Sequence, residues 1–226
     1  MDGKRKRPWW LGWIPATVLL ILIVGTVVTT SVLLSGGLGK PAPAATDGQV
    51  TDLNWSIFTA KGLAYIDSTR QVRIDFSRGP ADAAALGLPA DGSITIGPKD
   101  NGDVPLDYYL IVNGGGAGQG GDKFAVSQLT IETTAGVVSK VTAPLSDVLG
   151  FRQTLTKLEK KAPLFGWDVS GEAAIYARVE QASHDDVPYE FTFGPGDAVG
   201  VPISATAKCG TDGGCVVEYD VLPAVR

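Results

Sequence analysis

Two cysteines near the C-terminus have a spacing that points directly to chemistry. Cys209 and Cys215 are the chain's two cysteines, and the turn-forming segment Gly-Thr-Asp-Gly-Gly separates them. Such a turn brings two thiols together easily, and an even number of cysteines in an exported domain is typical of a disulfide. A structural zinc site would need a second pair of Cys or His ligands beside them. We therefore predict a disulfide between Cys209 and Cys215.

A cluster of oxygen-bearing residues is a candidate calcium site. Asp100, Asp103 and Asp107 lie in a turn-like stretch that also contains Asn101 and Gly102. Calcium takes such ligands in extracellular modules. The spacing lacks the sixth-position glycine and the closing glutamate of an EF-hand loop, and turns also recruit Asp, Asn and Gly for backbone reasons alone. Apart from these calcium candidates, we expect no metal.

A glycine-rich segment matches the letters of a dinucleotide-binding fingerprint. Residues 116–121 read G-A-G-Q-G-G and follow a strand-like run over Asp107–Val112. The fingerprint requires a helix directly after the glycines, because the helix N-terminus binds the pyrophosphate. Residues 123–132 read instead as a strand. We therefore expect a loop here, with no nucleotide and no other cofactor.

Residues that could catalyse a reaction are few. His184 is the one histidine and follows Ser183, but neighbours in a loop rarely face each other as the members of a Ser–His–acid triad do. No G-x-S-x-G motif occurs. A hydrolase that uses carboxylates such as Glu172, Glu180 or Glu190 is the remaining enzymatic hypothesis. We favour a protein that binds over one that catalyses.

An apolar cluster near residue 165 is a candidate interface. Leu164, Phe165 and Trp167 directly follow a predicted helix, in the most exposed-looking apolar stretch of the chain. The other aromatic residues lie mainly in strand-like segments, where packing in the core is the usual role. We expect an interaction surface at Leu164, Phe165 and Trp167.

The elements that must position these residues are mainly strands. Short runs of apolar and polar residues, several of them alternating with the period of two that half-buried strands show, recur between turn signals from residue 53 to the C-terminus. No alternation of strand and helix that would indicate a parallel sheet is visible. We expect strands at 53–58, 63–66, 71–76, 93–96, 107–112, 123–132, 137–142, 172–181, 189–193, 199–207 and 215–222.

One amphipathic helix is predicted between Ser146 and Pro163. Ser146 is a suitable N-cap, apolar residues share one face from Val148 onward, and three lysines gather at the C-terminal end. The expected fold class is therefore mainly β, or α+β. It is an antiparallel β-rich domain that forms either a sandwich or a sheet with one amphipathic helix packed on it.

The N-terminal region predicts a membrane anchor. No charged residue interrupts the apolar stretch 9–34, and a span needs about 20 such residues. Residues 4–7 are all basic and the other flank offers Lys40, so the N-terminus is expected in the cytoplasm and the remainder outside. A cleaved signal peptide has a shorter apolar region of about 7–15 residues. We predict an uncleaved signal-anchor.

The sequence divides into four parts. We predict a cytoplasmic basic leader at 1–8, a transmembrane helix at 9–34, a Gly/Pro/Ala-rich linker at 35–50 and an extracytoplasmic β-rich domain at 51–226. The net charge is −5, and because residues 1–39 carry +3, the remainder carries −8. A domain this acidic argues against nucleic acid and against docking on anionic lipid.

The expected function follows from topology and from the lack of a catalytic pattern. We expect a single-pass membrane-anchored, extracytoplasmic binding or interaction protein of the cell envelope. Its partner would be another envelope protein or a cell-wall component. One alternative is the carboxylate hydrolase named above. Another is an accessory subunit of a membrane complex that acts through its transmembrane helix.

Overall fold

The computed structural model describes residues 44–101, 104–115, 122–185 and 187–223. The chain divides into two compact units, Met1–Pro43 and Ala44–Arg226, and every described residue belongs to the second. The predicted leader, the predicted transmembrane helix and most of the predicted linker lie outside the described residues. Among the residues that are described, no helix is long and apolar enough to cross a membrane.

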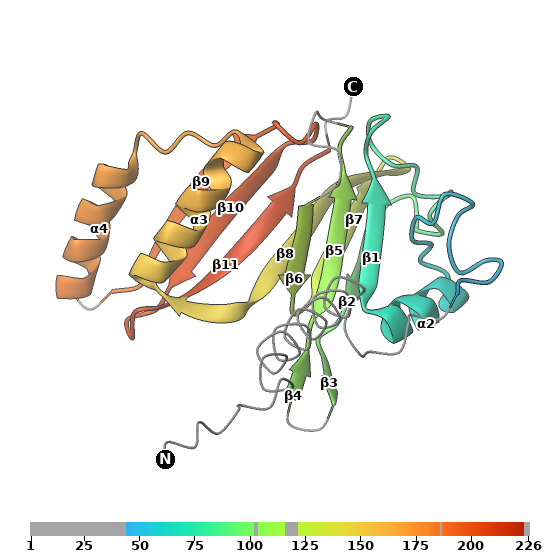
Figure 1. Cartoon of the computed structure of the whole chain (residues 1–226), viewed down its shortest axis with the longest axis horizontal. Helices are drawn as coiled ribbons and strands as arrows, with labels where there is room; N and C mark the ends of the chain where they lie inside the picture. The colour runs from blue at the N-terminus through green and yellow to red at the C-terminus, as the bar shows by residue number, and fades with distance from the viewer. Residues whose placement is uncertain (1–43, 102–103, 116–121, 186, 224–226) are drawn as a thin grey trace, which may run out of the picture. The chain divides into compact units, whose positions relative to one another are not determined.

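The second unit is mainly β, as predicted: an open, largely antiparallel sheet of nine strands with a few helices (Figure 1). The strand order is β1-β5-β6-β8-β11-β10-β9, and β7 joins β2 to β8. A separate hairpin is formed by β3 (Lys99–Asn101) and β4 (Val104–Leu106). The strands of the main sheet are β1 (Gln71–Asp75), β2 (Gly92–Ile96), β5 (Tyr108–Asn113), β6 (Asp122–Val126), β7 (Leu129–Thr134), β8 (Val137–Gly150), β9 (Tyr189–Gly196), β10 (Ile203–Cys209) and β11 (Gly214–Val221).

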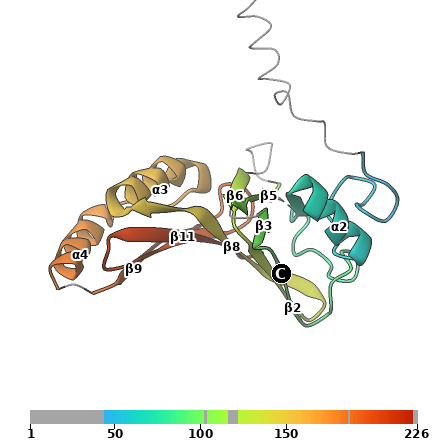
Figure 2. The same cartoon turned by 90° about the horizontal axis from the view of Figure 1, so that it is seen from below.

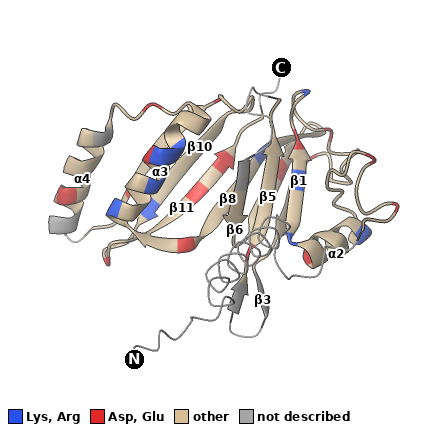
Figure 3. Cartoon of the chain, in the orientation of Figure 1, with Lys and Arg blue, Asp and Glu red and all other residues tan. Residues whose placement is uncertain are grey.

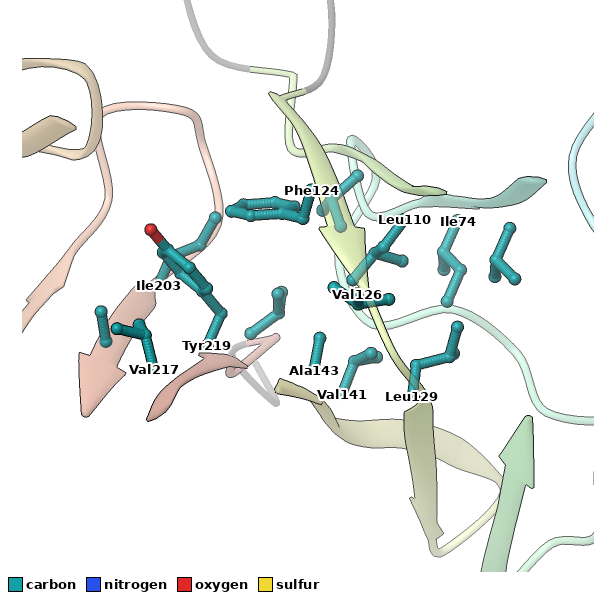
Figure 4. Packing of buried hydrophobic residues seen from close by; sticks show 14 of the residues in the cluster. Ile74, Leu110, Phe124, Val126, Leu129, Val141, Ala143, Ile203, Val217 and Tyr219 are labelled. Carbon is teal, nitrogen blue, oxygen red and sulfur yellow. The ribbon is translucent and has the colours of Figure 1, made fainter. Parts of the chain in front are cut away.

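The long strand β8 is the point at which the sheet folds over on itself. Its first half pairs with β7, its second half pairs with β11, and Leu145 pairs with Val126 of β6. The short ladder β6-β5-β1 therefore lies over one face of the longer ladder. Figure 4 shows Leu110 and Val126 of the first opposite Val141 and Ala143 of the second. Buried side chains of the two ladders meet in this part of the core.

The described helices gather on one side of the long ladder, which is seen edge-on in Figure 2. They are α2 (Ala60–Thr69), α3 (Phe151–Phe165) and α4 (Glu172–His184). The predicted amphipathic helix corresponds to α3, which packs on β8 to β11 through Leu155, Leu158 and Phe165, all fully buried. α4 lies beside β9, the last strand on that side of the sheet.

The boundaries of α3 differ from those predicted. Residues 146–150 continue β8, where Leu149 and Val148 pair with Cys215 and Val216, so Ser146 is not the N-cap. Sheet pairing prevails over the local capping signal there. Gly150 is the N-cap instead, and the helix ends two residues beyond Pro163, where Gly166 adopts the left-handed conformation with φ 75°.

Two predicted strands are helices, and one is neither. The expected strand at 63–66 lies in α2. Thr59 caps the N-terminus of this helix, because its side chain accepts a hydrogen bond from Gly62 N. The expected strand at 172–181 lies in α4, where alanine and glutamate favour helix. Short apolar runs do not distinguish the two structures by periodicity. The expected strand at 53–58 contributes an isolated bridge between Ser56 and Val50.

One pair of strands is parallel, although the sequence showed no sign of it. β1 pairs with β5 from Gln71 opposite Tyr109 to Asp75 opposite Asn113. The connection between them passes through β2, β3 and β4 rather than through a helix. Parallel pairing without a βαβ unit leaves no periodic pattern to recognise.

Replacing Gly196 by alanine is expected to lower the free energy of unfolding by about 2 kcal/mol, and Tm by about 4–8 °C. A Cβ atom at Gly196 would clash with the Phe165 carbonyl oxygen and lie 2.8 Å from the Gly166 carbonyl carbon. The main chain around these residues would therefore have to move. Gly171→Ala is the control, because nothing lies within 4 Å of its Cβ. Urea denaturation of both variants measures the difference. Equal stability of the two would contradict this packing.

Tyr108 is expected to make stability depend on pH in the alkaline range. Burial, reinforced by a 3.0 Å hydrogen bond from its hydroxyl to Asp67, raises the pKa of Tyr108 above its ordinary 10.0. The folded chain therefore holds this proton more tightly, and the stabilisation is complete below pH 10.0 and lost as pH rises through the folded-state pKa. Between about pH 9 and 12, the free energy of unfolding should fall more steeply for the wild type than for Tyr108→Phe. Parallel curves would refute the assignment.

Candidate functional site

The predicted disulfide is confirmed. Cys209 and Cys215 are bonded, and they are direct partners across the β10–β11 hairpin. Both side chains are buried. The loop they close is ordered by hydrogen bonds from Gly210 N to Gly214 O at 2.9 Å and from Gly214 N to the Asp212 carboxylate at 3.0 Å. The disulfide therefore holds the tip of this hairpin in one shape.

The expected exposed cluster at Leu164, Phe165 and Trp167 does not form. Phe165 is 0% exposed and Trp167 is 6% exposed, and the Trp167 indole donates a hydrogen bond of 2.7 Å to the Ile203 carbonyl. Leu164 alone of the three is exposed. The left-handed turn at Gly166 directs the chain back onto the sheet. The candidate interface is thereby corrected: two of its residues belong to the core.

The calcium candidates stay a prediction. Asp103 and the side chain of Asp100 lie outside the described residues. Asp107 is half-buried and lines the same hollow as Lys157 and Lys161. Across the part of the chain that the structure describes, no group of three or more His, Cys, Asp or Glu side chains is arranged to hold a metal ion.

The other predicted motifs are dispersed. The glycine-rich segment 116–121 lies outside the described residues, and the strand β6 follows it. His184, expected in a turn, is the last residue of α4. Glu172 begins α4, while Glu180 on α4 and Glu190 on β9 are both exposed. Neither Glu180 nor Glu190 is a buried carboxylate, and the side chain of Glu172 lies outside the described part of the structure.

Sequence reasoning missed a cleft at the end of the sheet where α3 begins. We call it the α3–α4 cleft. Its larger part has a volume of about 400 Å³. A second hollow of about 270 Å³ shares three residues with it, Phe151, Arg152 and Val179. The larger part is lined by the first turn of α3 at 150–153, Val179 of α4, Val187, Tyr189 of β9, and Gly210, Thr211 and Gly213 of the disulfide hairpin.

Aromatic rings form the wall of the α3–α4 cleft. Phe151 meets Tyr176, Tyr189 and Phe191 edge-on, at ring-centroid distances of 5.5, 5.8 and 5.9 Å. Such edge-to-face contacts are favourable and fix the orientation of each ring. Burial raises the pKa of Tyr189, so its phenol is neutral at physiological pH. The wall is rigid and almost without charge.

The charged residues of the α3–α4 cleft are Arg152 of α3 and Glu180 of α4. Arg152 lines both hollows, and Glu180 lines the smaller one. Gly150 is the N-cap and has no side chain with which to accept a hydrogen bond from the N–H groups of the first turn. The helix dipole adds partial positive charge at this end. The cleft thus offers apolar walls with donors at one side, which suits an apolar group carrying hydrogen-bond acceptors.

Comparisons with protein-family models, with curated proteins and with solved structures find no match to this chain.

Removal of the disulfide is expected to lower the free energy of unfolding by about 2 kcal/mol, because the closed loop is short. The double variant Cys209→Ala/Cys215→Ala, unfolded in urea, measures this loss. Wild-type protein in reducing agent is the matched control and should lose a similar amount. Because both cysteines are buried, the chain is unfolded in urea, where iodoacetamide should add mass after reduction and not before it. Two thiols that react without reduction would contradict the bond.

Proposed function

We propose that this chain is a single-pass membrane-anchored binding protein whose extracytoplasmic domain captures an extended segment of another cell-envelope protein in the α3–α4 cleft. The observation that carries the proposal is the aromatic, disulfide-bounded cleft of about 400 Å³. Ligand sites are commonly concave, mostly apolar and few per protein. The anchor at 9–34 and the outward orientation are part of the proposal and rest on the sequence.

The position of the cleft beside an edge strand favours a polypeptide ligand. β9 is the last strand on its side of the sheet, and no strand pairs with its outer edge within the described residues. An edge strand offers N–H and C=O groups to an added strand, and pockets for alternate side chains provide specificity. Tyr189, the first residue of β9, also lines the cleft. One ligand can therefore use both features.

The exposed apolar residues around the cleft support the same proposal. Val187 is 46% exposed and Tyr176 is 39% exposed, and both contribute to its walls. Burying apolar surface contributes about 25 cal/mol per Å². Rigid aromatic side chains lose little entropy when they bind, so they are effective anchors.

The rival enzymatic hypothesis has less support. Glu180 and Glu190 are both exposed to solvent, whereas enzyme active sites commonly exclude water from the reacting groups. Within the part of the chain that is described, the cleft contains one carboxylate, Glu180. Hydrolysis of glycosides by paired carboxylates needs two facing each other.

Photo-crosslinking in intact membranes tests the proposal. A benzophenone amino acid at Val187 is expected to form an adduct with one envelope polypeptide, whereas the same probe at Leu53, which is 73% exposed, should not. Mass spectrometry of the Val187 adduct identifies the peptide. Adducts of equal yield at both positions would refute the cleft as the binding site. An adduct with carbohydrate alone would replace the polypeptide partner by a cell-wall component.

Two sets of variants make this test specific. Tyr176→Ala removes one aromatic wall of the cleft and should lower the Val187 adduct yield about tenfold, the loss of about 1.4 kcal/mol expected for one hot-spot contact. Leu222→Ala is the control, since Leu222 is 37% exposed and does not line the cleft. Exchange of residues 9–34 for an unrelated span should leave the adduct intact. Its loss would favour an accessory subunit that acts through the transmembrane helix.

A further inference from the structure

We propose a second binding site, separate from the α3–α4 cleft, in which Lys157, Lys161 and Ser146 bind the oxyanion of a small ligand, a carboxylate or a phosphate group. The site is a hollow of about 280 Å³ between α3, β6 and the second half of β8. We call it the lysine hollow. Its lining residues are Asp107, Phe124, Ala125, Leu145, Ser146, Asp147, Lys157, Lys161 and Tyr219.

The helix α3 concentrates positive charge in an acidic domain. It carries Arg152, Lys157, Lys160 and Lys161 against the single carboxylate of Glu159, a net charge of +3. Figure 3 shows this as blue bands along α3. Residues 40–226 together carry a net charge of −8. The positively charged side chains of α3 therefore form a segment that attracts anions within an acidic part of the chain.

Two of these lysines are held on one face of the helix. Lys157 and Lys161 are four residues apart, so they lie one turn apart on the same side. The Lys161 ammonium lies 5.3 Å from the centroid of Phe124 and 5.6 Å from that of Phe165. These cation–π contacts position the charge against the aromatic wall of the hollow. The Lys157 ammonium lies 3.1 Å from the Asp147 carboxylate at the rim.

A buried hydroxyl supplies an independent observation. The Ser146 Oγ is buried and has no hydrogen-bond partner among the described residues, although Ser146 lines a hollow with two ammonium groups. A buried polar atom without a partner costs free energy, and such atoms in native proteins often bind a ligand, an ion or a water molecule. An oxyanion would accept one hydrogen bond from Ser146 and others from the lysines.

The lining holds two carboxylates, those of Asp107 and Asp147, and the two ammonium groups of Lys157 and Lys161, so its formal charges balance and it is not built for a bare metal cation. Asp107, one of the calcium candidates, lies here with both ammonium groups, which repel a divalent cation. Asp147 is already paired with Lys157. The volume of about 280 Å³ is roughly nine times the 30 Å³ that a water molecule occupies in the liquid, so a phosphate or a small carboxylic acid fits.

Ligand-dependent thermal unfolding of the full chain in maltoside micelles, which contain no phosphate, tests the site. Inorganic phosphate and acetate are titrated separately at constant ionic strength with chloride. A saturable rise in Tm with either probe is expected, and the stronger probe identifies the oxyanion. A rise that increases without saturating, or no rise with both probes, would overturn the proposal.

Matched variants assign the effect to the lysine hollow. Lys161→Gln and Ser146→Ala should each weaken the stronger probe at least tenfold. Lys160→Gln changes the same charge on the same helix at an exposed position and should leave the affinity unchanged. Lys161→Arg, which keeps the charge, serves as the second variant if Lys161→Gln does not fold, and should retain saturable binding. Equal affinities in Lys161→Gln and Lys160→Gln would overturn the assignment.

Discussion

An aromatic cluster beneath α3 is the contact on which the rest of this domain depends. Phe165 of α3 stacks on Phe124 of β6 at a ring-centroid distance of 5.8 Å and makes a tilted contact with Trp167 at 4.7 Å, and Tyr219 of β11 lies 4.7 Å from Phe124. These rings join the short ladder, the long ladder and the helix, and they are among the most buried side chains of the domain. Figure 4 shows Phe124 and Tyr219 side by side at this junction.

The two proposed sites occupy different stretches of the helix that this cluster holds in place. The N-terminal turn, with Phe151 and Arg152, forms one wall of the α3–α4 cleft, and Lys157 and Lys161 farther along line the lysine hollow. Side chains on a packed helix have little freedom to rearrange, and precise sites require such support. A change that shifts α3 on the sheet therefore affects both sites together.

The sequence predicted features that depend on local chemistry and missed those that depend on distant contacts. The disulfide and the mainly antiparallel sheet follow from turn residues and from alternation, and α3 follows from its apolar face. Ser146 illustrates the limit: its capping signal is real, but pairing of Val148 with Val216 extends β8 past it. The residues that line the α3–α4 cleft are spread between positions 150 and 213 of the sequence, and no local sequence pattern shows that they come together in the fold. The sequence suggested that Phe165 and Trp167 are exposed. They are buried because the turn at Gly166, which leaves no periodic pattern in the sequence, folds them onto the sheet.

The charge distribution explains how an acidic domain can hold two sites that favour acceptor groups. A net charge of −8, which residues 40–226 carry, is in general unfavourable for contact with anionic surfaces. At physiological ionic strength the field of distant carboxylates is screened within about 8 Å, whereas the lysines of α3 act at contact. Selectivity then comes from the local donors and the aromatic walls rather than from the overall charge. The domain can thus repel most anions while admitting those that fit against α3.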